Sequence, residues 1–134
     1  MNMDPDQRYK PGVCNMGNRE ISVRKKLLVF FSVFTLTFTV LCFTYCDSLF
    51  CWFALIGSSF AAITIYLEIK FRFCIVFGFF HLYNFKQLGN LEEVNCKDDQ
   101  RCDKKRVRKI IFQSLFVSVI YSSIIHVMAM NHPF

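Results

Sequence analysis

The chain alternates between long apolar segments and shorter polar ones. Apolar residues dominate 27–46, 49–67 and 110–130, and a weaker apolar stretch lies within 71–88. A helix needs about 20 consecutive apolar residues to cross a hydrocarbon layer of about 30 Å. The pattern therefore predicts an all-α integral membrane protein whose transmembrane helical domain covers residues 27–130.

The polar segments lie outside these apolar runs. Residues 1–26 are interrupted by Pro5 and Pro11 and predict a disordered, mobile basic tail. Residues 86–109 predict the one sizeable hydrophilic loop, and residues 131–134 form a short C-terminal tail.

The segment 71–88 decides how many times the chain crosses the membrane. It is apolar in the middle but carries Arg72 and His81 near its ends. If it crosses, the basic tail and the loop 86–109 lie on opposite faces of the membrane. If it lies at the surface, both regions share one face with all 16 Lys and Arg, as the positive-inside tendency prefers.

The cysteines favour the first alternative. With four spans and a cytosolic tail, four of the seven cysteines reach the outer face, where disulfides persist. These disulfide candidates are Cys46, Cys51, Cys96 and Cys102, and their pairing stays open. We therefore expect a bundle of four transmembrane helices, with three as the alternative.

The same cysteines do not have the spacing of a metal site. A structural zinc site needs two pairs separated by two to four residues. Here the two intervals are four and five residues, and a membrane hairpin separates them. We expect neither a bound metal nor a cofactor.

Composition and charge narrow the functional classes. The chain is 54% hydrophobic and 19% charged, whereas a soluble domain is about 45–50% apolar and about one-quarter charged. The net charge of +6 comes from two basic regions, residues 1–26 and 86–109. In each region a basic cluster directly precedes an apolar run, a position suited to lipid head groups and topology rather than nucleic acid. These cluster residues are Arg24, Lys25, Lys26, Lys104, Lys105, Arg106, Arg108 and Lys109.

Small and hydroxyl side chains recur three or four residues apart on the predicted helices. In lipid, such residues let helix backbones approach closely and form interhelical hydrogen bonds. The predicted packing residues are Ser32, Thr35, Thr39, Ala54, Gly57, Ala61, Ser114, Ser118 and Ser122. A sharper alternative is a small oligomeric ion channel, lined by the three serines of the last helix and His126.

Two ionisable residues border the apolar core, Glu68 and His126. Such residues at membrane depth are costly and tend to serve a function. With four spans both would lie near the cytosolic face, so a polar pair between them is one hypothesis.

The four-span arrangement is similar in outline to tetraspan membrane proteins. It lacks the Cys-Cys-Gly of tetraspanins, and the large first loop of claudins has no room between Cys46 and Cys51. We expect a non-enzymatic protein of the endoplasmic reticulum or plasma membrane. It would act through lateral helix packing and its loop as an assembly, trafficking or surface-interaction factor, with other membrane proteins or itself as partner. An accessory subunit of a membrane enzyme is a further alternative.

Overall fold

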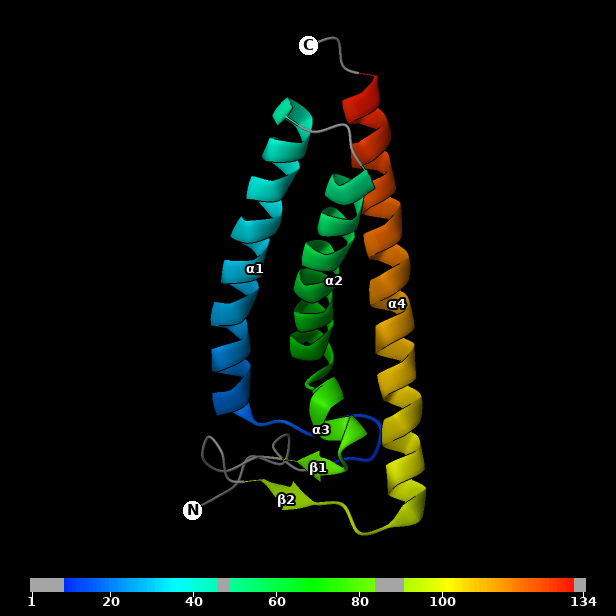
Figure 1. Cartoon of the computed structure of the whole chain (residues 1–134). Coiled ribbons are helices and arrows are strands. Elements are labelled where there is room, and N and C mark those ends of the chain that lie inside the picture. Colours follow the sequence, from blue (N-terminus) through cyan, green and yellow to red (C-terminus); the bar gives the residue numbers. More distant parts are fainter. Residues whose placement is uncertain (1–8, 46–48, 84–90, 132–134) are drawn as a thin grey trace.

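Three long helices dominate the structure (Figure 1), a computed structural model that describes residues 9–45, 49–83 and 91–131. They are α1 (Asn18–Tyr45), α2 (Leu49–Phe71) and α4 (Lys97–Met130). The remaining elements are the short helix α3 (Ile75–Phe79) and an antiparallel pair of two-residue strands, β1 (Leu82–Tyr83) and β2 (Glu92–Glu93). In the described part of the chain, three helices are long and apolar enough to cross a membrane.

The helix α2 packs against both α1 and α4. Figure 1 shows α1 and α4 running in one direction and α2 in the other, with α3 and the strands gathered at the end where α2 stops and α4 starts. Near the opposite end, the hydroxyls of Thr39 on α1 and Tyr121 on α4 lie 2.8 Å apart. The bundle therefore has three helices in an up-down-up arrangement, with a small cap at one end.

The preferred fourth span over residues 71–88 is not found among the described residues. α2 ends at Phe71, and the next residue, Arg72, has a left-handed backbone (φ 51°). The following helix has five residues and rises only about 7.5 Å, after which the chain enters a strand. Residues 84–88 lie outside the described residues. The structure thus corresponds to the three-span alternative.

A hydrogen-bonded turn explains why α2 stops there. The N–H of Phe73 donates to the carbonyl of Glu68 at 3.0 Å, and the N–H of Arg72 donates to that of Ile69 at 3.3 Å. This bond pair defines a Schellman cap, in which a left-handed residue follows the helix and an apolar contact closes the turn. The apolar contact is supplied by the cluster of Phe73, Val107 and Ile110, against which Leu67 packs.

Two polar regions are more ordered than the sequence suggested. Residues 9–17 pack against the end of the bundle instead of forming part of a mobile tail, and residues 18–26 belong to α1. Residues 97–109 likewise form the first turns of α4 rather than a loop. Asp98 and Asp99 in the first turn of α4 favour helix initiation, because acidic side chains interact favourably with the positive end of the helix dipole.

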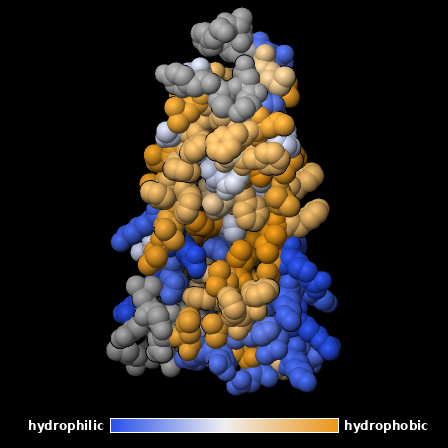
Figure 2. Space-filling model, viewed as in Figure 1, coloured by the Kyte–Doolittle hydropathy of each residue, from blue (hydrophilic) through white to orange (hydrophobic). Residues whose placement is uncertain are grey.

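Charge is strongly segregated along the bundle axis. Arg8 and Lys86 lie outside the described residues, and every other Lys and Arg lies at the end that contains α3. Figure 2 shows hydrophilic residues gathered at this charged end and a broad apolar surface above it. The charged end, defined here as residues 9–26, 68–83 and 91–109, holds most of the polar chemistry of the molecule.

Candidate functional site

The N-terminal segment is fastened to the turn after α2 by Asn15. Its side-chain amide donates to the carbonyl of Cys74 at 3.1 Å, and the N–H of Cys74 donates back to its oxygen at 2.7 Å. The backbone N–H groups of Asn15 and Met16 also donate to the carbonyl of Arg72, at 3.1 and 3.4 Å. Asn15 and Met16 have no exposed surface, so this segment is part of the core of the charged end.

Glu68 is buried beside this turn and forms an ion pair with Arg24 of α1. An Nη1 of Arg24 lies 3.5 Å from Oε2 of Glu68, and the N–H of Ile75 donates to Oε1 at 3.1 Å. Only 3% of the Glu68 side chain is exposed. A buried carboxylate needs such partners because removal from water is costly. The pair joins α1, α2 and α3 at one point.

The predicted pair between Glu68 and His126 is not formed. His126 lies near the other end of the bundle, with its ring centroid 6.4 Å from that of Trp52 at the start of α2. Glu68 lies near the end of the same helix, α2, almost its full length away. Because α2 and α4 run in opposite directions, the end of α2 and the end of α4 lie at opposite ends of the bundle. A fourth span between these helices would have placed Glu68 and His126 at the same end.

Cys74 is enclosed by the same contacts. Nη2 of Arg24 lies 2.9 Å from its sulfur. Burial raises the pKa of the Cys74 thiol to about 11, and the nearby Glu68 carboxylate adds to the rise. A thiol with a raised pKa is a poor nucleophile and a poor metal ligand, so Cys74 is a packing residue. The described residues contain no cluster of His, Cys, Asp and Glu able to hold a metal ion.

A second buried carboxylate, Asp103 on α4, holds the N-terminal segment from the other side. It accepts hydrogen bonds of 2.7 Å from the hydroxyl of Tyr9 and 2.7 Å from the N–H of Gly12. Tyr9 also stacks on Tyr83 with ring centroids 4.7 Å apart. Burial and the bond to Asp103 raise the pKa of Tyr9, so its hydroxyl stays protonated as a donor.

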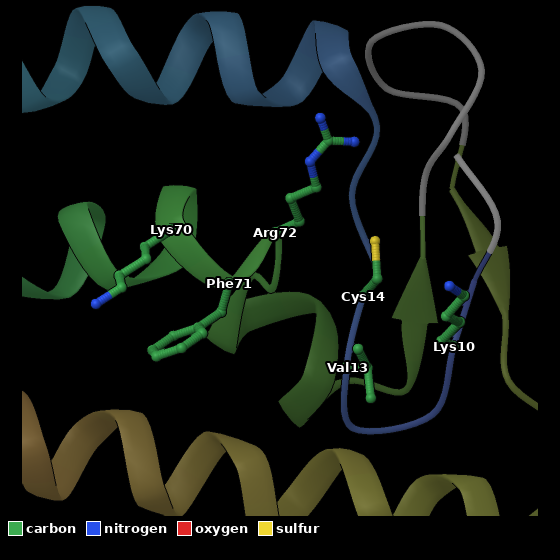
Figure 3. Close-up of a pocket in the computed structure, with 6 residues that line it drawn as sticks. All are labelled: Lys10, Val13, Cys14, Lys70, Phe71 and Arg72. Carbon is green, nitrogen blue, oxygen red and sulfur yellow. The ribbon is translucent and has the colours of Figure 1, made fainter. Parts of the chain in front are cut away.

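A hollow of about 340 Å³ lies between the N-terminal segment and the end of α2. Figure 3 shows its lining, which comes from Lys10, Val13 and Cys14 on one side and Lys70, Phe71 and Arg72 on the other. Half of these residues are cationic, and none is acidic. This cationic lining makes the hollow the candidate anion-binding site among the described residues.

The predicted packing serines of α4 are buried in the structure. Ser114, Ser118 and Ser122 have no exposed surface, and Oγ of Ser122 lies 3.5 Å from Oγ of Ser59 on α2. The three serines are thus enclosed within the isolated chain, and the channel hypothesis, which needs several copies, stays a prediction.

The other two predicted stripes are only partly buried. On α1, Thr35 is buried and Ser32 and Thr39 are half-buried. On α2, Gly57 is exposed, and nothing lies within 4 Å of where its side chain would begin. Ala54 and Ala61 are half-buried, while the buried face of α2 carries Leu55, Ser58 and Ser59. The packing face of α2 is therefore shifted around the helix from the predicted stripe.

The predicted disulfides receive no support at the charged end. Cys96 precedes α4 and Cys102 lies in its second turn, and both are exposed free thiols. Cys46 lies outside the described residues, so its pairing with Cys51 stays a prediction.

Two of the eight predicted head-group residues have internal partners. Arg24 forms the ion pair with Glu68, and the guanidinium of Arg106 lies 4.2 Å from the centre of the Phe71 ring. The other six are exposed or nearly so at the charged end: Lys25, Lys26, Lys104, Lys105, Arg108 and Lys109. All eight residues were predicted from their position before an apolar run. That position does not tell an arginine with an internal partner from an exposed one.

No protein family matches the sequence, no curated protein matches it, and no solved structure matches the fold. The site is therefore interpreted from its own geometry and chemistry.

Proposed function

We propose that the chain is an integral membrane protein with three transmembrane helices and its charged end in the cytosol. The support is the segregation of charge, because cytosolic segments of membrane proteins carry an excess of Lys and Arg. All 16 Lys and Arg of the sequence lie in residues 8–26, 70–86 or 97–109, outside the apolar parts of the three long helices. The endoplasmic reticulum and the plasma membrane are the compartments that we propose.

Within the membrane the protein acts without catalysis, through lateral contact with a transmembrane helix of a partner. The observation that carries this proposal is a hollow of about 330 Å³ on the outer face of α1, lined by Leu36, Thr37, Val40 and Leu41. All four side chains are exposed in the isolated chain. This shallow groove between side chains of α1 can receive a side chain of a second helix, and such packing drives association in lipid.

Two hydroxyls on this outer face add hydrogen-bonding capacity. Thr37 donates to the carbonyl of Val33 at 2.9 Å, and Thr44 donates to that of Val40 at 3.0 Å. A hydroxyl that donates one bond still has lone pairs to accept another. Thr37 and Thr44 are seven residues apart, so they lie on one side of α1 two turns from each other.

The cytosolic part of α4 provides a second contact surface in place of the predicted loop. Residues 97–109 are helical and extend about 20 Å along the helix axis. The first turns of α1 lie at the same end (Figure 1). The two helix starts form a basic platform on which an acidic cytosolic segment of the same partner can bind.

Site-specific photocrosslinking in intact membranes tests the lateral contact. A photoreactive side chain at Thr37 is expected to give a discrete adduct whose digest contains a peptide from a transmembrane segment. The matched control is Phe116, an exposed position on the outer face of α4, where only lipid adducts are expected. The mass of the adduct distinguishes a second copy from another protein. Adducts with lipid alone at both positions would refute the proposal.

A further inference from the structure

We infer that the hollow at the end of α2 binds the phosphorylated head group of an anionic lipid in the cytosolic leaflet. The hollow is the space of about 340 Å³ between Lys10 of the N-terminal segment and Lys70 and Arg72 at the end of α2. This inference rests on the proposed three-span topology, but the site is separate from the outer face of α1 and does not depend on the lateral contact proposed there.

The charge of the lining selects an anion. Lys10, Lys70 and Arg72 all line the hollow. Within the described part of the chain, the two buried acids have other partners, since Glu68 pairs with Arg24 and Asp103 accepts bonds from Tyr9 and Gly12. The positive charges of the hollow are thus not neutralised by either carboxylate.

The depth of the hollow places it at the level of lipid head groups. The apolar part of α2 ends at Leu67, and Lys70 lies three residues further along the helix, or about 4.5 Å. The polar head-group layer is roughly 5–8 Å thick on each side of the hydrocarbon core. Basic pockets beside transmembrane helices at this level suit anionic head groups.

The spread of the cations indicates the kind of head group. In Figure 3, Arg72 extends towards α1, Lys70 extends away from the N-terminal segment, and Lys10 lies near the strands. The three cationic residues line the hollow from different sides, and their charged ends do not meet at one point. Such an arrangement suits a head group that carries several phosphates, such as a phosphorylated inositol, better than a single phosphate.

The backbone around the hollow is held independently of the three side chains. The turn containing Lys10 is closed by the bonds between the backbones of Lys10 and Cys14, at 2.9 and 3.0 Å. Arg72 has a left-handed backbone (φ 51°) at the cap position that glycine prefers. Substitution of these side chains therefore removes charge while the fold is kept.

The test measures binding of dioctanoyl phosphatidylinositol 4,5-bisphosphate to the full chain in neutral detergent micelles by titration calorimetry. The variant Lys10→Gln/Lys70→Gln/Arg72→Gly is expected to bind at least tenfold more weakly than the unchanged chain. Thermal unfolding of the variant reports separately whether it is folded.

A matched variant removes the same number of charges elsewhere. Lys104→Gln/Lys105→Gln/Lys109→Gln lies on an exposed part of α4 and is expected to change the affinity less than threefold. Equal weakening in both variants, or no binding to the unchanged chain, would overturn the inference.

Two further titrations identify the source of the phosphate. Inositol 1,4,5-trisphosphate has the same head group without acyl chains, and phosphatidylserine has a lipid anchor without the added phosphates. The inference expects the inositol lipid to bind at least tenfold more tightly than either. Equal affinity for inositol trisphosphate would assign the hollow to a soluble polyphosphate and overturn the lipid assignment.

Discussion

Two buried carboxylates, Glu68 and Asp103, determine how the charged end is assembled. Glu68 links α2 to Arg24 of α1 and to the N–H of Ile75. Asp103 links α4 to Tyr9 and Gly12 of the N-terminal segment. Each acid bonds to a segment far away in the sequence, so loss of either partner leaves a poorly solvated charge.

The ion pair between Arg24 and Glu68 can be measured with a double-mutant cycle. Arg24→Gln leaves the buried carboxylate without its cation and is expected to lower the free energy of unfolding by about 3 kcal/mol. Glu68→Gln keeps an oxygen for the N–H of Ile75 and is expected to cost less. The double variant should cost clearly less than the sum of the two, as measured by denaturant unfolding in mixed micelles. Additive costs would show that the two side chains do not interact.

The reactivity of the thiols follows from their burial. With a pKa of about 11, about 0.1% of Cys74 is thiolate at pH 8, and the side chain has no exposed surface. Exposed Cys102 is therefore expected to react with maleimide at least 100-fold faster at pH 8. Because the pKa is raised, each unit of pH up to 10 should speed labelling of Cys74 about tenfold. Mass spectrometry of timed samples checks both rates, and similar rates at pH 8 would contradict the buried position.

At the scale of the elements, close packing along α4 holds the molecule together. Ser114, Ser118 and Ser122 face α2, and Val107 and Ile110 pack near Phe73 at the charged end. Small side chains bring α2 and α4 close together along their apolar parts, while larger ones fill the space near α3. The serine face and the Val107–Ile110 face of α4 should therefore respond differently to substitution.

The serine face of α4 offers a paired prediction. Oγ of Ser114 is buried and has no hydrogen-bond partner in the described structure, so Ser114→Ala is expected to be neutral or to stabilise by up to about 1 kcal/mol. Ser118→Leu inserts a large side chain between α2 and α4 and is expected to cost about 1–3 kcal/mol. Thermal unfolding in micelles compares the two. A loss of stability in Ser114→Ala equal to that in Ser118→Leu would contradict this packing.

Two glycines provide a second matched pair. A Cβ at Gly78 would lie 2.7 Å from Val107 and 2.8 Å from the Phe73 ring, whereas a Cβ at Gly57 meets nothing within 4 Å. Gly78→Ala is expected to lower the free energy of unfolding by about 1–3 kcal/mol because the contact is too close. Gly57→Ala should raise it by up to about 1 kcal/mol through helix propensity. The opposite order of stabilities would show that α3 does not pack on α4 as described.

The sequence predicted the long helices well and the cap at the charged end poorly. Apolar runs of about 20 residues are a direct physical signal, so α2 and α4 contain the predicted spans 49–67 and 110–130, and α1 covers residues 27–45 of the predicted span 27–46. The end of α2 depends on the left-handed backbone of Arg72, a conformation that the presence of an arginine does not predict. Asn15 and Asp103 were missed because each finds its partners more than fifty residues away. No local pattern carries that information.

At the scale of the whole molecule, charge and apolar surface are separated along one axis. Figure 2 shows the polar end and the apolar band on one face, and the buried network of Glu68, Asn15 and Asp103 lies within the polar end. This separation supports the proposed three-span topology with both basic regions in the cytosol. The free thiols of Cys96 and Cys102 agree with that proposal, because the cytosol keeps thiols reduced.

Labelling of Cys96 and Cys102 with a membrane-impermeant maleimide tests this topology most directly. The label is applied to intact cells and to permeabilised cells, with and without reductant, and mass spectrometry locates the modified cysteines. With three spans, both residues should be modified only after permeabilisation and without any need for reductant. Modification in intact cells, with or without prior reduction, would place residues 91–109 outside and contradict the three-span topology.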